Sequence, residues 1–328
     1  MRIIVDAFGG DNAPLEIIKG SVDAHNEFGY DIILVGDENK IRICALENGI
    51  DISAMEIVHT DDVISMHDSA RSILREHKNS SLGLGMQLLA EGRGDGFVTA
   101  GSTAAYVLAA HKFIGEIPGL KKAATAAVMP NDEGKFLMMD CGANLTCTPD
   151  VLHQFAIMGS AYMKSVFGIE NPRVALANIG VEESKGTDTL RDAYKLMSEQ
   201  DYNFVGNIEI CDIPFGGADV VVCEGFTGNV ILKMYEGTAS MLLGNIKRIF
   251  KTNAKTKVGY LCISSEMGDF KKKMDHKVYG GAPLMGIAKP VAKAHGSSDA
   301  KAFKYAIKQI ADYAEGGAID IITEAVKK

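Results

Sequence analysis

Glycines stand next to acids, amides and hydroxyls at five places in this 328-residue chain. In chain order, the five clusters are Asp6–Asp11, Ala100–Thr103, Asp140–Asn144, Asn178–Gly186 and Cys223–Asn229. A glycine lets backbone N–H groups turn toward a bound anion, and the N-terminus of a following helix adds partial positive charge. One such cluster alone is more simply a tight turn between a strand and a helix. Five of them together predict a polar cleft that holds phosphate.

Several catalytic motifs are absent from the sequence. It contains no G-x-G-x-x-G, no G-x-S-x-G and no H-E-x-x-H, and Gly134-Lys135 is followed by Phe136 where a Walker A motif needs Ser or Thr. The six cysteines form no C-x-x-C pair, so zinc and redox-pair sites have little support. We therefore expect no metal and no cofactor.

The charge of the chain is unevenly distributed. Its net charge is −8, which argues against general binding to nucleic acid. Residues 245–280 nevertheless carry nine lysines or arginines against three acids. Such a basic island on an acidic protein is a candidate docking surface for an anionic partner or a membrane.

Short β-branched runs that alternate with helical patterns must position the polar clusters. The predicted strands are Arg2–Asp6, Asp31–Gly36, Met55–His59, Gly96–Thr99, Ala123–Met129, Lys135–Asp140, Arg173–Asn178, Asn203–Glu209 and Val220–Cys223. This alternation predicts an α/β fold of three layers, a largely parallel sheet with helices on both faces, whose ligands lie beyond the carboxyl ends of the strands. We expect a single domain over residues 1–328, with residues 245–277 as an exposed helical arm.

No stretch of the sequence is long and apolar enough to predict a membrane span. The longest uncharged run, residues 96–111, has 16 residues, whereas a span needs about 20. The chain opens on Met1–Asp6, which indicates a strand and not a signal peptide. We therefore expect a soluble, cytoplasmic protein.

The polar clusters and two later segments occur in an order that closely resembles the bacterial phosphate acyltransferase family, over residues 2–326. The segments that carry the resemblance are Asp6–Asp11, Asp140–Asn144, Asn178–Gly180 with Glu183 and Lys185-Gly186, Gly225–Asn229 with Leu232-Lys233, Gly280–Leu284 and His295–Ser298. The chain departs from the family pattern twice. Ser102 stands where the family has Asn, so the amide is lost at this position. Glu224 stands where the family has Asp, so the carboxylate is kept.

The resemblance implies a fold similar to isocitrate and isopropylmalate dehydrogenases and to phosphotransacetylases. It implies a homodimer that transfers a long-chain acyl group from acyl-carrier protein to inorganic phosphate. The acyl phosphate would pass to a glycerol-3-phosphate acyltransferase in phospholipid synthesis, so peripheral membrane association is expected as well.

For this reaction we assign roles within the clusters as hypotheses. Phosphate is already an anionic nucleophile near neutral pH, so positioning and oxyanion stabilisation matter most. Lys185 neutralises the phosphate, and Asn229, with backbone N–H groups of Gly228 or Gly101, polarises the thioester carbonyl. His295 protonates the leaving sulfur, and Asp6 orients these donors or assists acid–base chemistry. The residues predicted to bind phosphate or substrate are Gly9, Gly10, Asp11, Gly101, Ser102, Thr103, Asn144 and Gly228.

Simpler structural roles compete with these assignments. Asn229 is equally suited to cap a helix that begins near Val230. Asp6 and Asp11 are candidates to cap the helix that begins near Pro14. Asp188 and Asp192, four residues apart, more simply stabilise a helix N-terminus than bind a metal.

The basic arm has more than one interpretation. Lys271, Lys272 and Lys273 are predicted to dock the acidic carrier protein. Apolar residues of the arm would suit insertion into a membrane surface, or packing on the second subunit of a dimer. Three other functions stay open: a phosphotransacetylase-like enzyme acting on acyl-CoA, a metal-dependent NAD-linked dehydrogenase, and a non-catalytic membrane scaffold.

Overall fold

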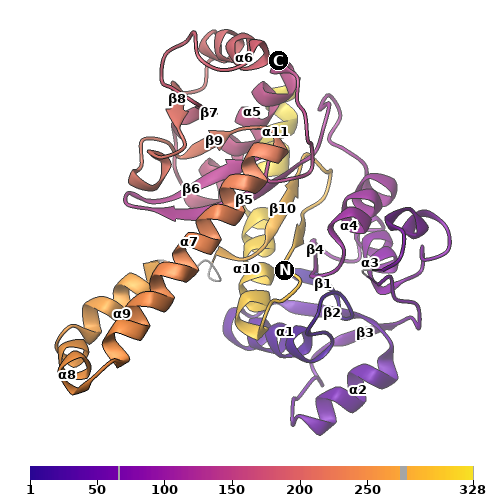
Figure 1. Cartoon of the computed structure of the whole chain (residues 1–328). Helices are drawn as coiled ribbons and strands as arrows, with labels where there is room; N and C mark the ends of the chain where they lie inside the picture. Colours follow the sequence, from indigo (N-terminus) through magenta and orange to yellow (C-terminus); the bar gives the residue numbers. More distant parts are fainter. Residues whose placement is uncertain (66, 274–278, 328) are drawn as a thin grey trace.

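In the computed structural model, residues 1–65, 67–273 and 279–327 are described, and eleven strands among them form one sheet (Figure 1). The order across the sheet is β3-β2-β1-β4-β11-β10-β5-β6-β9-β7-β8. The strands are β1 (Arg2–Asp6), β2 (Asp31–Gly36), β3 (Glu56–His59), β4 (Gly96–Thr99), β5 (Ala124–Asn131), β6 (Gly134–Met139), β7 (Val174–Asn178), β8 (Phe204–Glu209), β9 (Val220–Val222), β10 (Ala282–Met285) and β11 (Val291–Lys293).

The sheet consists of two parallel blocks joined by an antiparallel centre. β3, β2, β1, β4 and β11 pair in parallel and form the first half. β6, β9, β7 and β8 pair in parallel and form the second half. Between them, β10 pairs antiparallel with β11 and β5, and β5 pairs antiparallel with β6. The predicted largely parallel α/β fold is confirmed, with a mixed centre that the sequence did not indicate.

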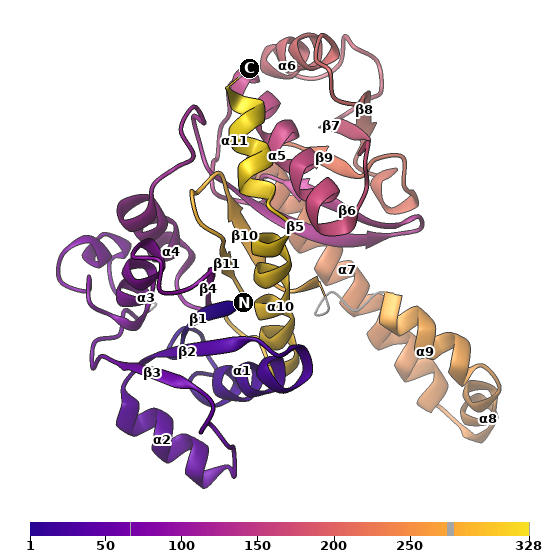
Figure 2. The same cartoon turned by 180° about the vertical axis from the view of Figure 1, so that it is seen from behind.

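Helices cover both faces of the sheet, as predicted (Figures 1 and 2). Those outside the arm are α1 (Leu15–Phe28), α2 (Glu38–Glu47), α3 (Ser81–Ala90), α4 (Thr103–Ala109), α5 (Pro149–Phe167), α6 (Asp188–Ser198), α10 (Ala300–Glu315) and α11 (Ala318–Val326). In the first half, Ile3 and Val5 of β1 join the core cluster that contains Phe303 of α10, whereas Ile4 joins the one that contains Tyr106 of α4. This alternation is what a strand buried on both faces requires.

All nine predicted strands are present, within two residues at each end. β10 and β11 were missed, because neither contains a β-branched run and Pro283 lies within β10. β9 is as short as β11 but reads Val-Val-Val, which favours a strand. β10 and β11 nevertheless lie at the middle of the sheet and join its two halves. The prediction of one domain is not tested by this continuity and stays a prediction.

A long helix leads from the sheet into the arm. α7 spans Gly225–Lys251, 27 residues or about 40 Å, and is followed by α8 (Ala254–Cys262) and α9 (Ser264–Lys273). Figure 2 shows these helices projecting away from the sheet, and neither α8 nor α9 contains a buried residue. Residues 274–277 of the predicted arm lie outside the described residues.

None of the helices in the described ranges has the length and apolar character needed to cross a bilayer.

Candidate functional site

The carboxyl ends of β1, β4 and β11 form what we call the first rim, residues 6–11, 99–103 and 293–297. Asp6 is buried there, with 2% of its surface exposed. Its carboxylate accepts hydrogen bonds from the Thr99 hydroxyl (2.7 Å) and the Phe8 N–H (3.2 Å). The same Thr99 oxygen accepts the N–H of Gly101 at 2.9 Å. Asp6 and Thr99 therefore fix the turns that follow two neighbouring strands.

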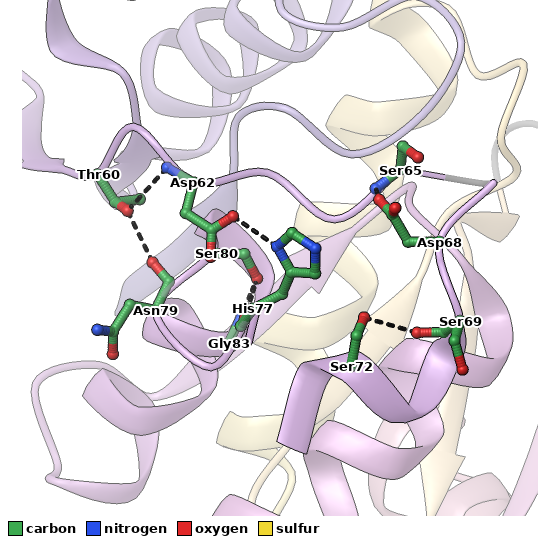
Figure 3. A network of polar contacts seen from close by, with 10 residues as sticks. All are labelled: Thr60, Asp62, Ser65, Asp68, Ser69, Ser72, His77, Asn79, Ser80 and Gly83. Atoms are coloured by element: carbon green, nitrogen blue, oxygen red, sulfur yellow. Dashed lines mark hydrogen bonds and ion pairs between the residues drawn. The ribbon is translucent and has the colours of Figure 1, made fainter. Parts of the chain in front are cut away.

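Burial raises the pKa of Asp6, and hydrogen bonds from Ser81, Thr99 and the backbone offset this only in part. Ser81 is the first residue of α3, and its N–H donates to the Asp62 carbonyl at 3.0 Å. Asp62 also accepts a 2.6 Å bond from His77, within the polar network of residues 60–83 shown in Figure 3. This network fixes the segment that carries Ser81, and Ser81 in turn hydrogen-bonds to Asp6 in the first rim.

Glycines let the loops of the first rim approach one another closely. Gly10 has a φ of +98°, and a Cβ there would lie 2.9 Å from both the Ala100 Cβ and the Gly296 carbonyl oxygen. The Asp11 N–H donates to that same carbonyl at 2.8 Å. Asp11 therefore ties the β1 loop to the β11 loop through its backbone. Its side chain caps no helix, since α1 begins after Pro14 without a side-chain cap.

His295 lies at the end of β11 in the first rim. Its Nδ1 is 2.9 Å from the Ser297 hydroxyl and accepts the Ser297 N–H at 3.3 Å. An accepting Nδ1 leaves the ring proton on Nε2, the nitrogen free to donate. Burial lowers the pKa of His295, and the neighbouring Lys233 lowers it further.

The second rim consists of residues 140–144 and 224–229, after β6 and β9. Asp140 is fully buried, and its Oδ1 accepts four hydrogen bonds, from both donors of Thr125 and from the N–H groups of Gly142 and Ala143. Its Oδ2 accepts the backbone and side-chain N–H groups of Asn144, at 2.7 and 2.9 Å. The loop 140–144 is thus wound around one carboxylate.

The start of α7 is packed directly against this loop. Glu224 caps the helix by accepting the Thr227 N–H at 3.0 Å. A Cβ at Gly228 would overlap the Asp140 carbonyl oxygen, so only glycine fits there. Asn229 lies inside the helix, which starts five residues before the expected Val230, and it is not the N-cap. A Cβ on Gly142 would lie 3.8 Å from the Asn229 Cβ, so this side chain stands beside the turn.

Lys185 lies at the same carboxyl edge of the second half, on the loop after β7, the neighbour of β9. Two amides hold this loop: Asn178 donates to the Lys185 carbonyl at 3.2 Å, and Asn207 donates to the Glu182 carbonyl at 2.9 Å. The Lys185 ammonium lies 4.0 Å from Glu182, and 46% of the side chain is exposed. The loop therefore presents a cation that is only loosely paired.

The two rims meet beside α4. Ala143 of the second rim packs against the core cluster that contains Ala105 of α4 and Leu284 of β10. Across the same junction, the charges of Lys233 and Glu236 on α7 act on His295. The polar clusters of the first half, the 140–144 loop and the start of α7 are thereby brought together.

The hydrogen bonds divide the predicted site residues into two groups. The N–H groups of Gly101 and Gly228 already donate to Thr99 and to the Glu224 carbonyl, and the Asn144 amide donates to the Ala123 carbonyl and to Asp140. By contrast, the Ser102 side chain makes no capping bond at the start of α4, although it occupies the N-cap position. Within the described part of the chain, the Asn229 amide has no hydrogen-bond partner either. These free groups are the ones available to a substrate.

Lys271, Lys272 and Lys273 lie on α9, away from both rims (Figure 1). The side chain of Lys272 is 84% exposed, against 41% for that of Lys273. Lys271 lies over the Tyr260 ring, and Lys273 pairs with Asp132 at the β5–β6 turn at 3.2 Å. Lys273 therefore anchors the arm as well as adding charge.

One group of metal-ligating side chains is found in the described ranges: Asp37, His59 and Asp61, whose ligand atoms lie within 4.8 Å of one another. Asp37 already accepts the Lys40 N–H and pairs with the Lys40 ammonium, and His59 Nδ1 accepts the Glu38 N–H. These groups are satisfied without an ion. Asp188 is paired with Arg191 on the first turn of α6.

Five residues that shape the site were given no role from the sequence: Thr99, Thr125, Asp140, Lys233 and Lys293. Asp140 was visible as the acid that follows a buried strand. Lys233 lies four residues after Asn229, and so on the same face of α7. Lys293 had no signal, because the strand that carries it was not predicted.

Known proteins match almost the whole length of this chain. Residues 1–320 match the family described as fatty acid synthesis protein. The chain is 45% identical over 325 residues to a phosphate acyltransferase of Acetivibrio thermocellus, covering 99% of this chain and 96% of that protein. It is 38% identical over 329 residues to one of Clostridioides difficile, covering 100% of this chain and 97% of that protein.

Solved structures share the fold at low sequence identity. A phosphotransacetylase from Streptococcus pyogenes superposes with a TM-score of 0.64 at 19% identity, over 98% of this chain and 94% of that one. A branched-chain phosphotransacylase from Enterococcus faecalis gives a TM-score of 0.60 at 14% identity, over 96% and 99%. These structures confirm the predicted phosphotransacetylase-like fold.

Proposed function

The chain belongs to the phosphate acyltransferase family, and from this premise we propose that it moves a long-chain fatty acyl group from acyl-carrier protein to inorganic phosphate. A phosphate oxygen attacks the thioester carbonyl, the C–S bond breaks, and the carrier thiol leaves. The acyl phosphate then serves glycerol-3-phosphate acylation in phospholipid synthesis, through a downstream acyltransferase.

One observation carries this proposal: the free hydrogen-bond donors stand where the two rims meet. Asn229 lies against Gly142, and its amide makes no hydrogen bond within the described residues. The Ser102 hydroxyl, at the start of α4, makes no capping hydrogen bond. We assign polarisation of the thioester carbonyl to the Asn229 side chain, because the N–H groups of Gly101 and Gly228 are engaged. Such donors act most strongly on a developing oxyanion where water is excluded.

The remaining roles follow from charge and protonation. Lys185 neutralises phosphate, since its ammonium is only loosely paired with Glu182. His295 donates the proton of Nε2 to the leaving sulfur. Asp6, buried behind the first rim, orients Thr99 and the Gly101 turn.

The cysteine thiols beside the second rim are poorly suited to act as nucleophiles, which favours direct attack by phosphate. Burial raises the pKa of Cys141, of Cys223 and, to about 11, of Cys147. A thiol held protonated is a poor nucleophile. An acyl-cysteine intermediate therefore has no activated residue here.

A test of the chemistry uses the purified chain with palmitoyl-carrier protein and phosphate. We expect phosphate-dependent release of the carrier thiol, with much slower release from palmitoyl-CoA. Asn229→Ala lowers kcat by 100-fold or more, the scale of one lost oxyanion donor. Asn245→Ala, at a partly exposed position later on the same helix, serves as the control. Thiol release that needs no phosphate, or an Asn229→Ala variant with full activity, contradicts the proposal.

We further propose that the arm docks the carrier protein. Its described residues include eight lysines or arginines (Lys247, Arg248, Lys251, Lys255, Lys257, Lys271, Lys272 and Lys273) against Glu266 and Asp269. An acidic partner is steered toward such a surface, and the effect weakens with salt.

The docking test keeps Lys273, which pairs with Asp132, and reverses Lys271 and Lys272, whose contacts lie within the arm. Lys271→Glu/Lys272→Glu is expected to lower kcat/KM for the carrier substrate about 10-fold at low salt, with the difference shrinking as salt rises. Lys78→Glu/Lys112→Glu, the same charge change on the exposed surface of the first half, leaves it unchanged. Equal effects of the two double variants contradict docking at the arm.

The exposed apolar side chains of α7 and α8 suit two further contacts. Phe226, Val230, Met234, Met241 and Ile249 are exposed along α7, and Val258 and Leu261 on α8. The α7 positions recur every four to eight residues, as one stripe of a helix requires. We propose that a second copy of the chain covers this stripe in a homodimer, and that α8 touches the membrane surface peripherally.

A further inference from the structure

We infer that Lys293 and Lys233, contributed by opposite halves of the molecule, together bind a phosphate-type oxyanion at the junction of the rims. This rests on the proposed function and sharpens it, because Lys185 was the only cation assigned to phosphate there.

The position of Lys293 follows from strand register. β11 pairs with β4 so that Lys293 lies opposite Thr99, and β4 pairs with β1 so that Val98 lies opposite Val5. Thr99 in turn bonds to Asp6. Residues paired across parallel strands point to the same face, so Asp6, Thr99 and Lys293 lie side by side on the face covered by α3 and α4.

Among the residues that the structure describes, Lys293 has no acidic partner. Its ammonium donates to the Ala294 carbonyl at 3.0 Å, and no carboxylate from the described ranges lies within ion-pair distance of it. The side chain is partly buried. A half-buried lysine with one neutral acceptor has spare donors for an anion.

Lys233 approaches the same place from α7. It lies one turn after Asn229 on the same helix face, and Asn229 stands beside Gly142 of the second rim. Its ammonium pairs with Glu236 at 2.9 Å, and 52% of the side chain is exposed. Lys233 therefore projects from α7 toward the junction.

The electrostatics agree with this placement. Burial lowers the pKa of Lys293, and the charge of Lys233 lowers it further, against an opposing effect of Asp11. Lys233 acts in the same direction on His295. Two ammonium groups that repel one another in a partly buried place are stabilised most when an anion with two negative charges binds between them.

Two sources can supply the oxyanion. One is the inorganic phosphate that attacks, and the other is a phosphoryl group on the part of the acyl donor that carries the thioester. Both have the oxygens that lysine ammonium groups bind. The kinetics separate them, because phosphate and acyl donor are varied independently.

The experiment compares Lys293→Met and Lys233→Met with Lys289→Met, which changes a lysine just before the other end of β11. At saturating donor, we expect the KM for phosphate to rise 10-fold or more in the first two variants and to stay unchanged in the third. A rise confined to the KM of the donor assigns the same lysines to the donor's phosphoryl group. Both KM values unchanged in Lys293→Met and Lys233→Met overturn the inference.

A binding measurement keeps this inference separable from the proposed function. Thermal unfolding of the wild type is measured with phosphate and with chloride at equal ionic strength. We expect phosphate to raise Tm in the wild type and in Lys289→Met, and Lys293→Arg to keep more of the rise than Lys293→Met. A wild type that binds phosphate but forms no acyl phosphate contradicts the function alone. A phosphate-induced rise that persists in both Met variants, together with an unchanged KM for the donor, contradicts the inference alone.

Discussion

Each rim holds a buried aspartate at the carboxyl end of a strand, Asp6 as the last residue of β1 and Asp140 just after β6, yet the two carboxylates differ in how many hydrogen bonds they accept. Asp140 accepts six hydrogen bonds, four from backbone N–H groups and two from the side chains of Thr125 and Asn144. Asp6 accepts bonds from Thr99 and Phe8, and burial still raises its pKa.

This difference teaches what each rim contributes. A carboxylate with both oxygens saturated is a fixed framework, because moving any part of its loop leaves a buried donor unpaired. The hydrogen bonds to Asp6 do not fully offset the cost of burying its charge, so its protonation responds more readily to a bound substrate. The second rim therefore supplies a fixed geometry, and the first rim supplies a carboxyl group whose charge state can change.

The largest effect is expected from Asp140→Asn. The amide group places N–H donors against the N–H groups that now face an oxygen, and each unpaired buried donor costs about 1–3 kcal/mol. We expect the free energy of unfolding to fall by more than about 3 kcal/mol in urea denaturation. Asp6→Asn is expected to cost less, because its carboxyl faces fewer donors. Equal losses for the two variants break the comparison.

Gly228→Ala is expected to come next. A Cβ at Gly228 meets the Asp140 carbonyl oxygen, which is fixed backbone, whereas at Gly101 the nearest atom is the Thr99 hydroxyl oxygen at 3.2 Å. Overpacking of this kind costs about 1–3 kcal/mol. Gly237→Ala is the control on the same helix, since a Cβ there meets nothing within 4 Å and alanine favours a helix by about 0.5–1 kcal/mol. A Gly228→Ala variant as stable as Gly237→Ala contradicts this account of the second rim.

Two matched threonines sharpen the comparison further. Thr99→Val removes a donor to Asp6 and also the acceptor of the Gly101 N–H, so we expect a loss of about 1–2 kcal/mol. Thr125→Val removes one of six donors to Asp140, whose backbone donors remain, and is expected to cost about 0.5–1 kcal/mol. Calorimetric unfolding of both variants measures the difference. A larger loss at Thr125 would reverse the roles of the two rims.

The smallest effect is the pH dependence that Asp6 contributes. Because its pKa is raised in the folded protein above the usual 3.8, its contribution to stability is fully present below pH 3.8 and is lost as pH rises through the folded pKa. Each pH unit in that window changes stability by at most about 1.4 kcal/mol. Relative to the wild type, Asp6→Asn is expected to gain stability as pH rises from 4 to 7. A difference that is constant with pH contradicts a raised pKa.

The sequence predicted nine strands because β-branched runs separated by helical patterns are a strong local signal. It missed β10 and β11, whose few residues acquire strand structure only through their neighbours β4 and β5. For the same reason it could propose Asn229 and His295 but not Lys293. It also could not tell which donors are engaged, since the bonds of Asn144 to the Ala123 carbonyl and of Thr99 to Asp6 join residues far apart in the sequence.

Because α7 is one continuous helix from Gly225 to Lys251, its number of residues sets the direction in which the arm projects. Each residue inserted in a helix turns everything beyond it by about 100° and advances it by about 1.5 Å. One added residue between Glu236 and Asn245 would therefore swing Lys271 and Lys272 to another side of the molecule without touching either rim. Seven added residues, close to two full turns, would nearly restore their bearing while carrying them about 10 Å farther out.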